Sequence, residues 1–483
     1  MTVAPILDRQ WTSWFAFSVL LAFAGVAAPA MAGEPVARFH TKLAELEAGR
    51  GDLVTVLQIG DSHTASDHIS GRLRSLLQDR FGNGGRGFLP PGVPHAYYRP
   101  YQITVTQTAG WQLLTSNKSA PDAVAFGITG SVMRGSKPED VIVIEDRSGA
   151  GIATLRFGWR GRPDGGSLEV HAEGGLRSRL SMMGPADLPY RTSNNSLDPP
   201  ARRIELRPTG DGPVDLSSIT VYSRDRGVVV ANLGSPGAQI GIMGRWHAET
   251  VRAELKALDP ALIIVAFGTN EGFAPAERIA SGYAAEFERR IVALRAAAPD
   301  ADLVIVGPPD ANRFPRYCLP PAPPIAALQK RAATAPTPPQ RLLVRLSVRI
   351  GAIASAWPPQ EPPPATPCTP LSASERARYD QMLGAQDRAL CRWHTPAAIP
   401  LVREAQASVA ARLGVAFFDW GTLFGSECGA DAWTRKGLAH KDRVHLKQEG
   451  YAQTADRLHE LIMTGYPAPG AAPLPLPQSK PGR

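Results

Sequence analysis

The segment Val54–His63 places an acid and a serine directly after an apolar run. The run ends in Gly60, and Asp61 and Ser62 follow before a helical pattern begins. That pattern repeats apolar residues on one face, at Ile69, Leu73, Leu76 and Leu77. A serine between a buried strand and a helix lies at the positive end of the helix dipole. Because ligands of open α/β sheets bind outside the carboxyl ends of the strands, we expect Ser62 to be a nucleophile.

A serine hydroxyl attacks well only when a neighbouring base takes its proton. Near the other end of the chain, Asp442 and His445 lie three residues apart, just before the amphipathic stretch Gln448–Met463. A histidine with a near-neutral pKa suits the role of the base, and a carboxylate can orient it and stabilise its charged form. An isolated Asp-x-x-His pattern is more often a surface loop with an incidental histidine.

Acyl transfer also needs hydrogen-bond donors for the oxyanion, and two predicted strand ends offer them. Gly234 follows the apolar run Val228–Leu233, and a glycine can bring a bare backbone N–H close to a ligand. Asn270 follows the run Leu262–Phe267 and carries a side-chain amide. Taken singly, each segment is better explained as a strand-ending turn, in which Gly and Asn are favoured.

A parallel sheet would bring these residues together, and the apolar runs predict one. Near-continuous apolar runs are typical of buried parallel strands, and Leu303–Val306 and Val415–Phe418 predict two further strands. Helical stretches are expected at Arg245–Ala257, Ala276–Ala298 and Ala397–Leu413. Between them, turn residues separate short strand-like runs, which is typical of an all-β sandwich. These runs are Gln102–Gln107, Val141–Glu145, Ala153–Trp159, Ser167–Ala172, Arg203–Arg207 and Leu216–Tyr222.

We therefore expect one α/β domain with two insertions. Its three parts are residues 33–95, 227–312 and 394–465. The inserted all-β sandwich would span residues 96–226, and a proline-rich insertion residues 313–393, in which the alternating stretch Val344–Ile350 predicts a strand. The proline-rich tail, residues 466–483, is expected to be disordered.

The first 32 residues predict an export signal. Arg9 precedes the apolar stretch Trp14–Ala28, and Ala30-Met31-Ala32 has the form of a cleavage site, so the mature chain would begin at Gly33. The stretch is short for a membrane span of about 20 residues, so we expect cleavage and no stable membrane span afterwards. The expected location is the periplasm or the exterior of the cell.

Composition narrows the partners. The chain of 483 residues carries a net charge of +8, but its positive residues are scattered rather than arranged in a stripe, so nucleic acid is not an expected partner. Export makes the four cysteines disulfide candidates, with three possible pairings and no zinc-site spacing. They are Cys318, Cys368, Cys391 and Cys428. The sequence leaves the oligomeric state open.

The four chemical segments occur in the order of the four sequence blocks of the SGNH (GDS-type) hydrolase superfamily, which this chain resembles. They are Gly60-Asp61-Ser62, Gly234, Gly268-Thr269-Asn270 and Asp442–His445. By that resemblance Ser62 is the nucleophile, His445 the base and Asp442 its orienting group. The backbone amides of Ser62 and Gly234 and the side chain of Asn270 would form the oxyanion hole. The resemblance also implies a three-layer sandwich, with a five-stranded parallel sheet between helices, and no metal or other cofactor.

A closer resemblance, to the periplasmic peptidoglycan O-acetylesterases, rests on further features. They are His63, the run Phe81–Phe88, the β insertion after the first block, and Trp433. In those enzymes the inserted domain is similar to a carbohydrate-binding module. The implied function is removal of O-acetyl groups from a cell-envelope carbohydrate, with an O-acylated glycan, peptidoglycan above all, as substrate. Segment 313–393 departs from this pattern and leaves the glycan and the acyl group open. Two alternatives are an acyltransferase with the same triad and a non-catalytic carbohydrate-binding protein.

Other polar and aromatic residues near these blocks have mostly structural interpretations. His63 and His68 flank the nucleophile, and His63 contacts substrate, packs in the protein or is exposed to solvent. Asp67 is expected to be a surface charge near a helix start rather than an acid catalyst, and Arg86 either binds an acidic group or is solvated in its glycine-rich turn. Aromatic residues of a β domain could stack on sugars but belong more often to its core. These are Tyr97, Tyr98, Trp111 and Trp159.

Overall fold

The computed structural model of the protein describes residues 35–118, 124–185, 190–319, 366–470 and 474. The predicted export signal, the predicted strand Val344–Ile350 and most of the tail lie outside these residues. Within the described ranges, no helix is both long and apolar enough to cross a bilayer.

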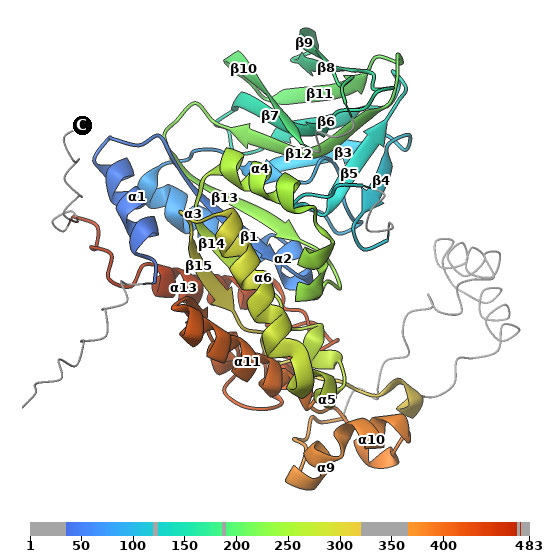
Figure 1. The fold of residues 1–483 in the computed structure, drawn as a ribbon. Helices are drawn as coiled ribbons and strands as arrows, with labels where there is room; N and C mark the ends of the chain where they lie inside the picture. Colours follow the sequence, from blue (N-terminus) through green and yellow to red (C-terminus); the bar gives the residue numbers. More distant parts are fainter. Residues whose placement is uncertain (1–34, 119–123, 186–189, 320–365, 471–473, 475–483) are drawn as a thin grey trace, which may run out of the picture. The chain divides into compact units, whose positions relative to one another are not determined.

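A parallel sheet of five strands forms the centre of the α/β part, in the order β13-β1-β14-β15-β16 (Figure 1). Its strands are β1 (Leu53–Gly60), β13 (Gly227–Gly234), β14 (Pro260–Ala266), β15 (Asp302–Val306) and β16 (Ala416–Phe418). Each lies within a residue or two of a predicted apolar run. These runs are apolar at almost every position because both faces of the sheet are covered.

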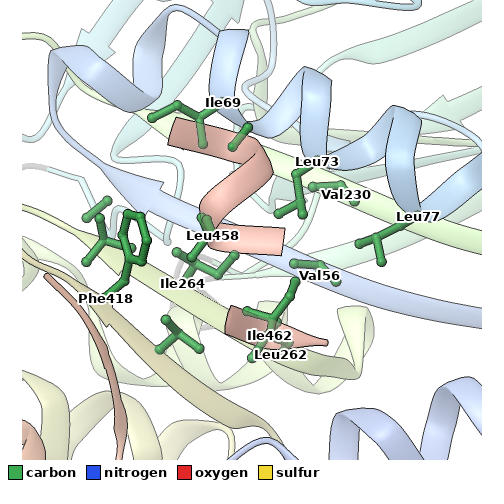
Figure 2. Packing of buried hydrophobic residues seen from close by; sticks show 14 of the residues in the cluster. Val56, Ile69, Leu73, Leu77, Val230, Leu262, Ile264, Phe418, Leu458 and Ile462 are labelled. Carbon is green, nitrogen blue, oxygen red and sulfur yellow. The ribbon is translucent and has the colours of Figure 1, made fainter. Parts of the chain in front are cut away.

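Side chains alternate between the two sides of each strand, so these apolar strands present apolar side chains on both faces of the sheet. Helices cover both faces. On one face, Val56, Val230 and Ile264 pack with α1 (Ala37–Glu47), α3 (His68–Phe81) and α13 (Gln448–Ile462), the last two seen in Figure 2. On the other face, Leu57 and Ile263 pack with α4 (Ala248–Leu258), α6 (Ala284–Ala297) and α11 (Ala398–Leu413). The three-layer sandwich that the resemblance implied is confirmed.

Three of the four apolar residues predicted for one face of α3 are buried, namely Ile69, Leu73 and Leu77. Leu76 is only partly buried. Arg74 is buried instead, with 1% of its surface exposed. A guanidinium at such a position must find polar partners inside the protein, and these are described below.

The β insertion is a sandwich of two antiparallel sheets, as predicted. One has the order β10-β7-β12-β5-β4 with β2 also paired to β12, and the other has the order β3-β6-β11-β8-β9. The strands are β2 (Gly87–Leu89), β3 (Ile103–Gln107), β4 (Gln112–Thr115), β5 (Ser131–Gly135), β6 (Ile142–Asp146), β7 (Ile152–Arg160), β8 (Ser167–Ala172), β9 (Gly175–Ser181), β10 (Arg191–Ala201), β11 (Arg203–Pro208) and β12 (Val214–Tyr222). Because β2 joins this sheet, the sandwich takes in residues before position 96.

Several details differ from the sequence-based expectations. The helix expected over Ala276–Ala298 is interrupted by a π-helical turn, Ile279–Tyr283, between α5 (Ala276–Arg278) and α6. Strand β10 escaped prediction because its residues show no apolar alternation. The remaining short α-helices of the described residues are α2 (Ser62–Ala65), α9 (Ala373–Ala377), α10 (Tyr379–Gly384) and α12 (Gly429–Arg435).

The aromatic residues considered as sugar contacts divide into two groups. Tyr98, Trp111 and Trp159 are buried in the core of the sandwich. Tyr97 is 77% exposed. The core interpretation therefore holds for three of the four.

Candidate active site

Ser62 begins the short helix α2 immediately after β1 and Asp61. The Asp61 side chain caps this helix by accepting the backbone N–H of His63 at 2.9 Å. Position 60 requires glycine, because a Cβ there would lie 2.2 Å from the side-chain oxygen of Thr64. This close approach of strand and helix fixes the partly buried Ser62 at the carboxyl end of the sheet.

His445 bridges Ser62 and Asp442. Its Nε2 lies 2.9 Å from Ser62 Oγ, and its Nδ1 lies 2.7 Å from Asp442 Oδ2. Asp442 Oδ1 also accepts the backbone N–H groups of Val444 and His445, both at 3.0 Å, so its own loop holds the carboxylate. Such a carboxylate favours the tautomer with hydrogen on Nδ1, which leaves Nε2 to accept the serine proton. The structure thus brings Ser62 together with Asp442 and His445, which follow it by more than 370 residues in the sequence.

The loop that carries His445 is anchored through Arg443, whose backbone adopts a left-handed φ of 55°. The Arg443 carbonyl accepts the N–H of Asn312 at 2.9 Å. The guanidinium forms an ion pair with the buried Asp431, with 2.9 Å between Nη2 and Oδ1, and lies 4.3 Å from the centre of the Trp393 ring. Because Trp393 belongs to the proline-rich insertion, that insertion supports the loop of the proposed base.

Two disulfides hold the same insertion, and they settle the pairing that the sequence left open. Cys318 bonds to Cys391, and Cys368 bonds to Cys428. The first closes the insertion on itself. The second ties it to the start of α12, the helix that leads into the His445 loop.

The pKa shifts of His445 and Asp442 both favour base catalysis. The hydrogen bond to Asp442 raises the pKa of His445 above its ordinary value of 6.5, although partial burial opposes this. Burial alone would raise the pKa of Asp442, but the hydrogen bonds from His445 and from the N–H of Val444 outweigh it and lower the pKa to about 2. Asp442 is therefore ionised throughout the neutral range and stabilises the imidazolium that forms when Ser62 attacks.

The pH dependence of activity follows from these directions. His445 must be neutral to act as a base, so kcat/KM for an acetate ester should fall as the pH drops through a pKa above 6.5. In Asp442→Asn the stabilising charge is lost, so the acid limb should move to lower pH, and kcat should fall about 10⁴-fold. Burial raises the pKa of Asp61 to about 6, so this group titrates in the same range. If the acid limb of the Asp442→Asn profile lies at the same pH as in wild type, the group that titrates there is Asp61 and not His445.

The two remaining predicted oxyanion donors lie at the ends of the strands on either side of β1. Gly234 is the last residue of β13 and packs against α2, the helix that Ser62 begins. A Cβ at position 234 would lie 2.0 Å from the backbone nitrogen of Ala65. Asn270 follows β14, and its side-chain amide donates to the carbonyl of Ala238 at 2.9 Å. One N–H of the amide suffices for that bond, which orients the group and leaves the second N–H for an oxyanion.

Replacing Asn270 with alanine should therefore lower kcat by about 10²–10³-fold, with a smaller change in KM. The loss should appear in kcat because the charge on the oxygen develops only in the transition state. Steady-state hydrolysis of p-nitrophenyl acetate measures both constants. A KM increase with an unchanged kcat would show that Asn270 contacts the ground state only.

His63 contributes a packed layer behind the base. It is 2% exposed, its Nδ1 lies 2.9 Å from the Tyr451 hydroxyl, and its ring centre lies 5.4 Å from that of His445. Burial lowers the pKa of His63 to about 3, so the ring stays neutral and does not repel the imidazolium of His445. Of the three interpretations of His63, the structure supports packing. His68 is partly buried and bonds the Tyr101 hydroxyl at 2.6 Å.

Asp67 is a buried ion-pair centre, and the prediction of a surface charge was wrong. Its side chain is 2% exposed and lies 3.1 Å from the guanidinium nitrogens of both Arg74 and Arg86. Its carboxylate also accepts the backbone N–H of Tyr101 at 2.7 Å. The acidic group that Arg86 binds is thus a residue of this chain, and Arg86 is buried rather than solvated. The pattern of α3 carried no signal of this burial, because Arg74 follows Leu73 and lies off the predicted apolar face.

Comparison with known proteins agrees with this geometry. The GDSL-like lipase/acylhydrolase family model matches residues 207–458, more than half of the chain. The match begins near the end of the β insertion, so it includes Asp442 and His445 but not Ser62. Among curated proteins, none matches at a significant level.

One solved structure shows the same fold. A peptidoglycan O-acetylesterase structure is 21% identical, with 90% of this chain and 98% of that one covered and a TM-score of 0.62. A family two carbohydrate esterase from Clostridium thermocellum is 9% identical, covers 75% of this chain and 98% of its own, and has a TM-score of 0.26. A protein from Bacillus subtilis is 11% identical, with 75% and 90% covered and a TM-score of 0.27. The last two superpose too poorly to support an inference.

The fold, the family match and the contact between Ser62 and His445 all agree with the SGNH resemblance. The chain therefore belongs to the GDSL-like lipase/acylhydrolase family and is an esterase.

Proposed function

We propose that the protein is an exported esterase that removes O-acetyl groups from a cell-envelope glycan, with peptidoglycan as its substrate. The hydrogen bond between His445 and Ser62, at 2.9 Å, carries the proposal, because it makes the serine a nucleophile. The β sandwich inserted directly after the nucleophile's segment supports a polymeric glycan as substrate. The fold that the chain shares with a peptidoglycan O-acetylesterase over 90% of its length agrees with this.

The reaction proceeds in two steps on the same three residues. His445 Nε2 takes the proton of Ser62 as Oγ attacks the ester carbonyl, and the oxyanion is held by the amides of Ser62 and Gly234 and the side chain of Asn270. The C–O bond to the sugar breaks, and His445 protonates the leaving sugar oxygen. His445 then deprotonates a water, which attacks the acetyl-serine; the bond from the acetyl carbon to Ser62 Oγ breaks, His445 returns the proton to Oγ, and acetate is released.

Two features support export. The first 32 residues have the pattern of a secretory signal. All four cysteines are paired in disulfides, which persist in oxidising compartments such as the periplasm.

Acetate release from O-acetylated peptidoglycan tests the proposal. The mature protein should release acetate from peptidoglycan faster than from acetylated xylan, and Ser62→Ala should release none above background. Fractionation of the cells, with the protein detected by antibody, should place it outside the cytoplasm.

Three other results would each contradict a different part of the proposal. Faster acetate release from xylan would show that peptidoglycan is not the preferred glycan. Transfer of acetyl to an added sugar in place of hydrolysis would identify an acyltransferase. Binding to peptidoglycan without release, by wild type and Ser62→Ala alike, would leave a carbohydrate-binding protein.

A further inference from the structure

A cavity of about 250 Å³ lies beside Gly234, one of the predicted oxyanion donors, between the hydrolase sheet and the β insertion. Gly60 and Gly234 line it from the hydrolase side, and Ser116 and Ser131 line it from the β insertion. Gly60 is two residues from the nucleophile Ser62. A group bound here therefore lies within reach of the same substrate molecule whose ester is attacked.

Four buried polar atoms of residues that line this cavity have no hydrogen-bond partner within the described part of the chain. They are Ser116 Oγ, Ser131 Oγ, Trp246 Nε1 and His95 Nδ1. Both serines are 2% exposed. Buried polar groups in folded proteins are nearly always paired, so four unpaired atoms around one cavity indicate a ligand that supplies the partners.

Gly130 keeps the space between two of these atoms open. A Cβ at this position would lie 3.0 Å from Ser116 Oγ and 3.4 Å from Trp246 Nε1, so both atoms face the same small volume. The backbone φ of +60° also favours glycine. A side chain here would fill the volume in which a ligand could meet both groups.

The cavity wall is fixed to the hydrolase before any ligand binds. The backbone N–H of Ile128 donates to the buried Glu254 of α4 at 2.6 Å. The N–H of His247 donates to the carbonyl of Phe126 at 2.7 Å. A site held in this way loses little conformational freedom on binding, which favours affinity.

The lining defines the chemistry of the ligand. The Trp246 indole can only donate a hydrogen bond, whereas the serine hydroxyls can donate or accept. Ile128, Ile242 and Phe267 add apolar surface. Among the described lining residues, Lys118 is the only one with a permanent charge, and it is exposed. These properties suit a compact neutral group with a carbonyl oxygen, an N–H and a methyl group.

We propose that this cavity is a subsite for the acetamido group of an N-acetylated amino sugar. Trp246 donates to the acetamido oxygen, Ser116 accepts the acetamido N–H, and the methyl group packs against the apolar lining. This deepens the proposed function and rests on it for the claim that the sugar belongs to the glycan whose ester reaches Ser62.

Removal of both polar groups tests the subsite. The double variant Ser116→Ala/Trp246→Phe should raise KM for O-acetylated peptidoglycan about tenfold, the cost of lost hydrogen bonds to a bound ligand. Its kcat/KM for p-nitrophenyl acetate should stay within about twofold, since that ester has no acetamido group. The matched control is Trp159→Phe, which removes an indole N–H bonded to Ser193 Oγ at 3.1 Å and away from the cavity lining. This variant should leave KM for O-acetylated peptidoglycan and kcat/KM for p-nitrophenyl acetate unchanged.

A binding measurement separates this inference from the proposed function. Ser62→Ala protein should bind a trimer of N-acetylglucosamine more tightly than a trimer of glucosamine, and the double variant should lose the difference. If this holds while wild type releases no acetate from peptidoglycan, the subsite stands and the proposed function fails. If peptidoglycan is deacetylated but KM and trimer binding are unchanged in the double variant, the subsite is overturned. An equal loss on p-nitrophenyl acetate also overturns it, because the cavity then holds the acyl group.

Discussion

Ser62→Ala should lower kcat for p-nitrophenyl acetate by about 10⁶-fold, and His445→Ala should have an effect of similar size. Without the Oγ atom no acetyl-enzyme can form, and without the imidazole nothing removes the serine proton. The two groups are in contact at 2.9 Å and act in one step. The double variant should therefore be no slower than either single variant. Steady-state rates of the three proteins provide the measurement.

The control is a serine in the same region with no role in the chemistry. Ser66→Ala removes a hydroxyl that donates to the backbone carbonyl of His63 at 3.0 Å, and it should keep most of the activity. Rate losses that multiply in the double variant of Ser62 and His445 would mean that the two residues act independently. In that case the hydrogen bond to His445 would not be what activates Ser62 as a nucleophile.

The parallel sheet and the sequence-distant triad could be predicted because both leave local signals. Buried parallel strands are apolar at almost every position, so β1, β13 and β14 are visible in the sequence. A strand that ends in Gly60 and is followed by Asp61 and Ser62 marks the carboxyl edge of the sheet. Any other segment predicted at that edge, such as the one ending in Gly234, then becomes a candidate partner.

Features that depend on contacts between distant segments left no such signal. The pairing of Cys368 with Cys428 requires knowledge of how the proline-rich insertion folds back. The unpaired atoms of Ser116 and Trp246 meet only because the β insertion packs against the hydrolase. Asp67 and Arg86 are 19 residues apart, and a charge at a helix start is usually solvated. Composition and periodicity describe single elements, so they miss contacts of this kind.

Asp67→Ala should lower the free energy of unfolding by about 3–5 kcal/mol, the usual cost of removing one partner of a buried ion pair. Burial alone would raise the pKa of Asp67, but Arg74 and Arg86 outweigh it and lower the pKa to about 2, so the carboxylate is charged at neutral pH. The guanidiniums of both arginines are 1% exposed and would lose their counter-charge without gaining solvent. Urea denaturation followed by circular dichroism measures the loss.

An exposed ion pair on the same helix and a second substitution test whether the stability loss of Asp67→Ala comes from the burial of unpaired charge. Asp456 pairs with Arg72 on α3 at 2.8 Å, but both side chains are more than 40% exposed, so Asp456→Ala should cost less than about 1 kcal/mol. In the Asp67→Ala protein, adding Arg86→Met should recover stability, because it removes an unpaired buried charge and keeps an apolar side chain. If Arg86→Met instead adds to the loss, the main role of Asp67 is its hydrogen bond to the backbone of Tyr101, which joins the start of α3 to the β insertion.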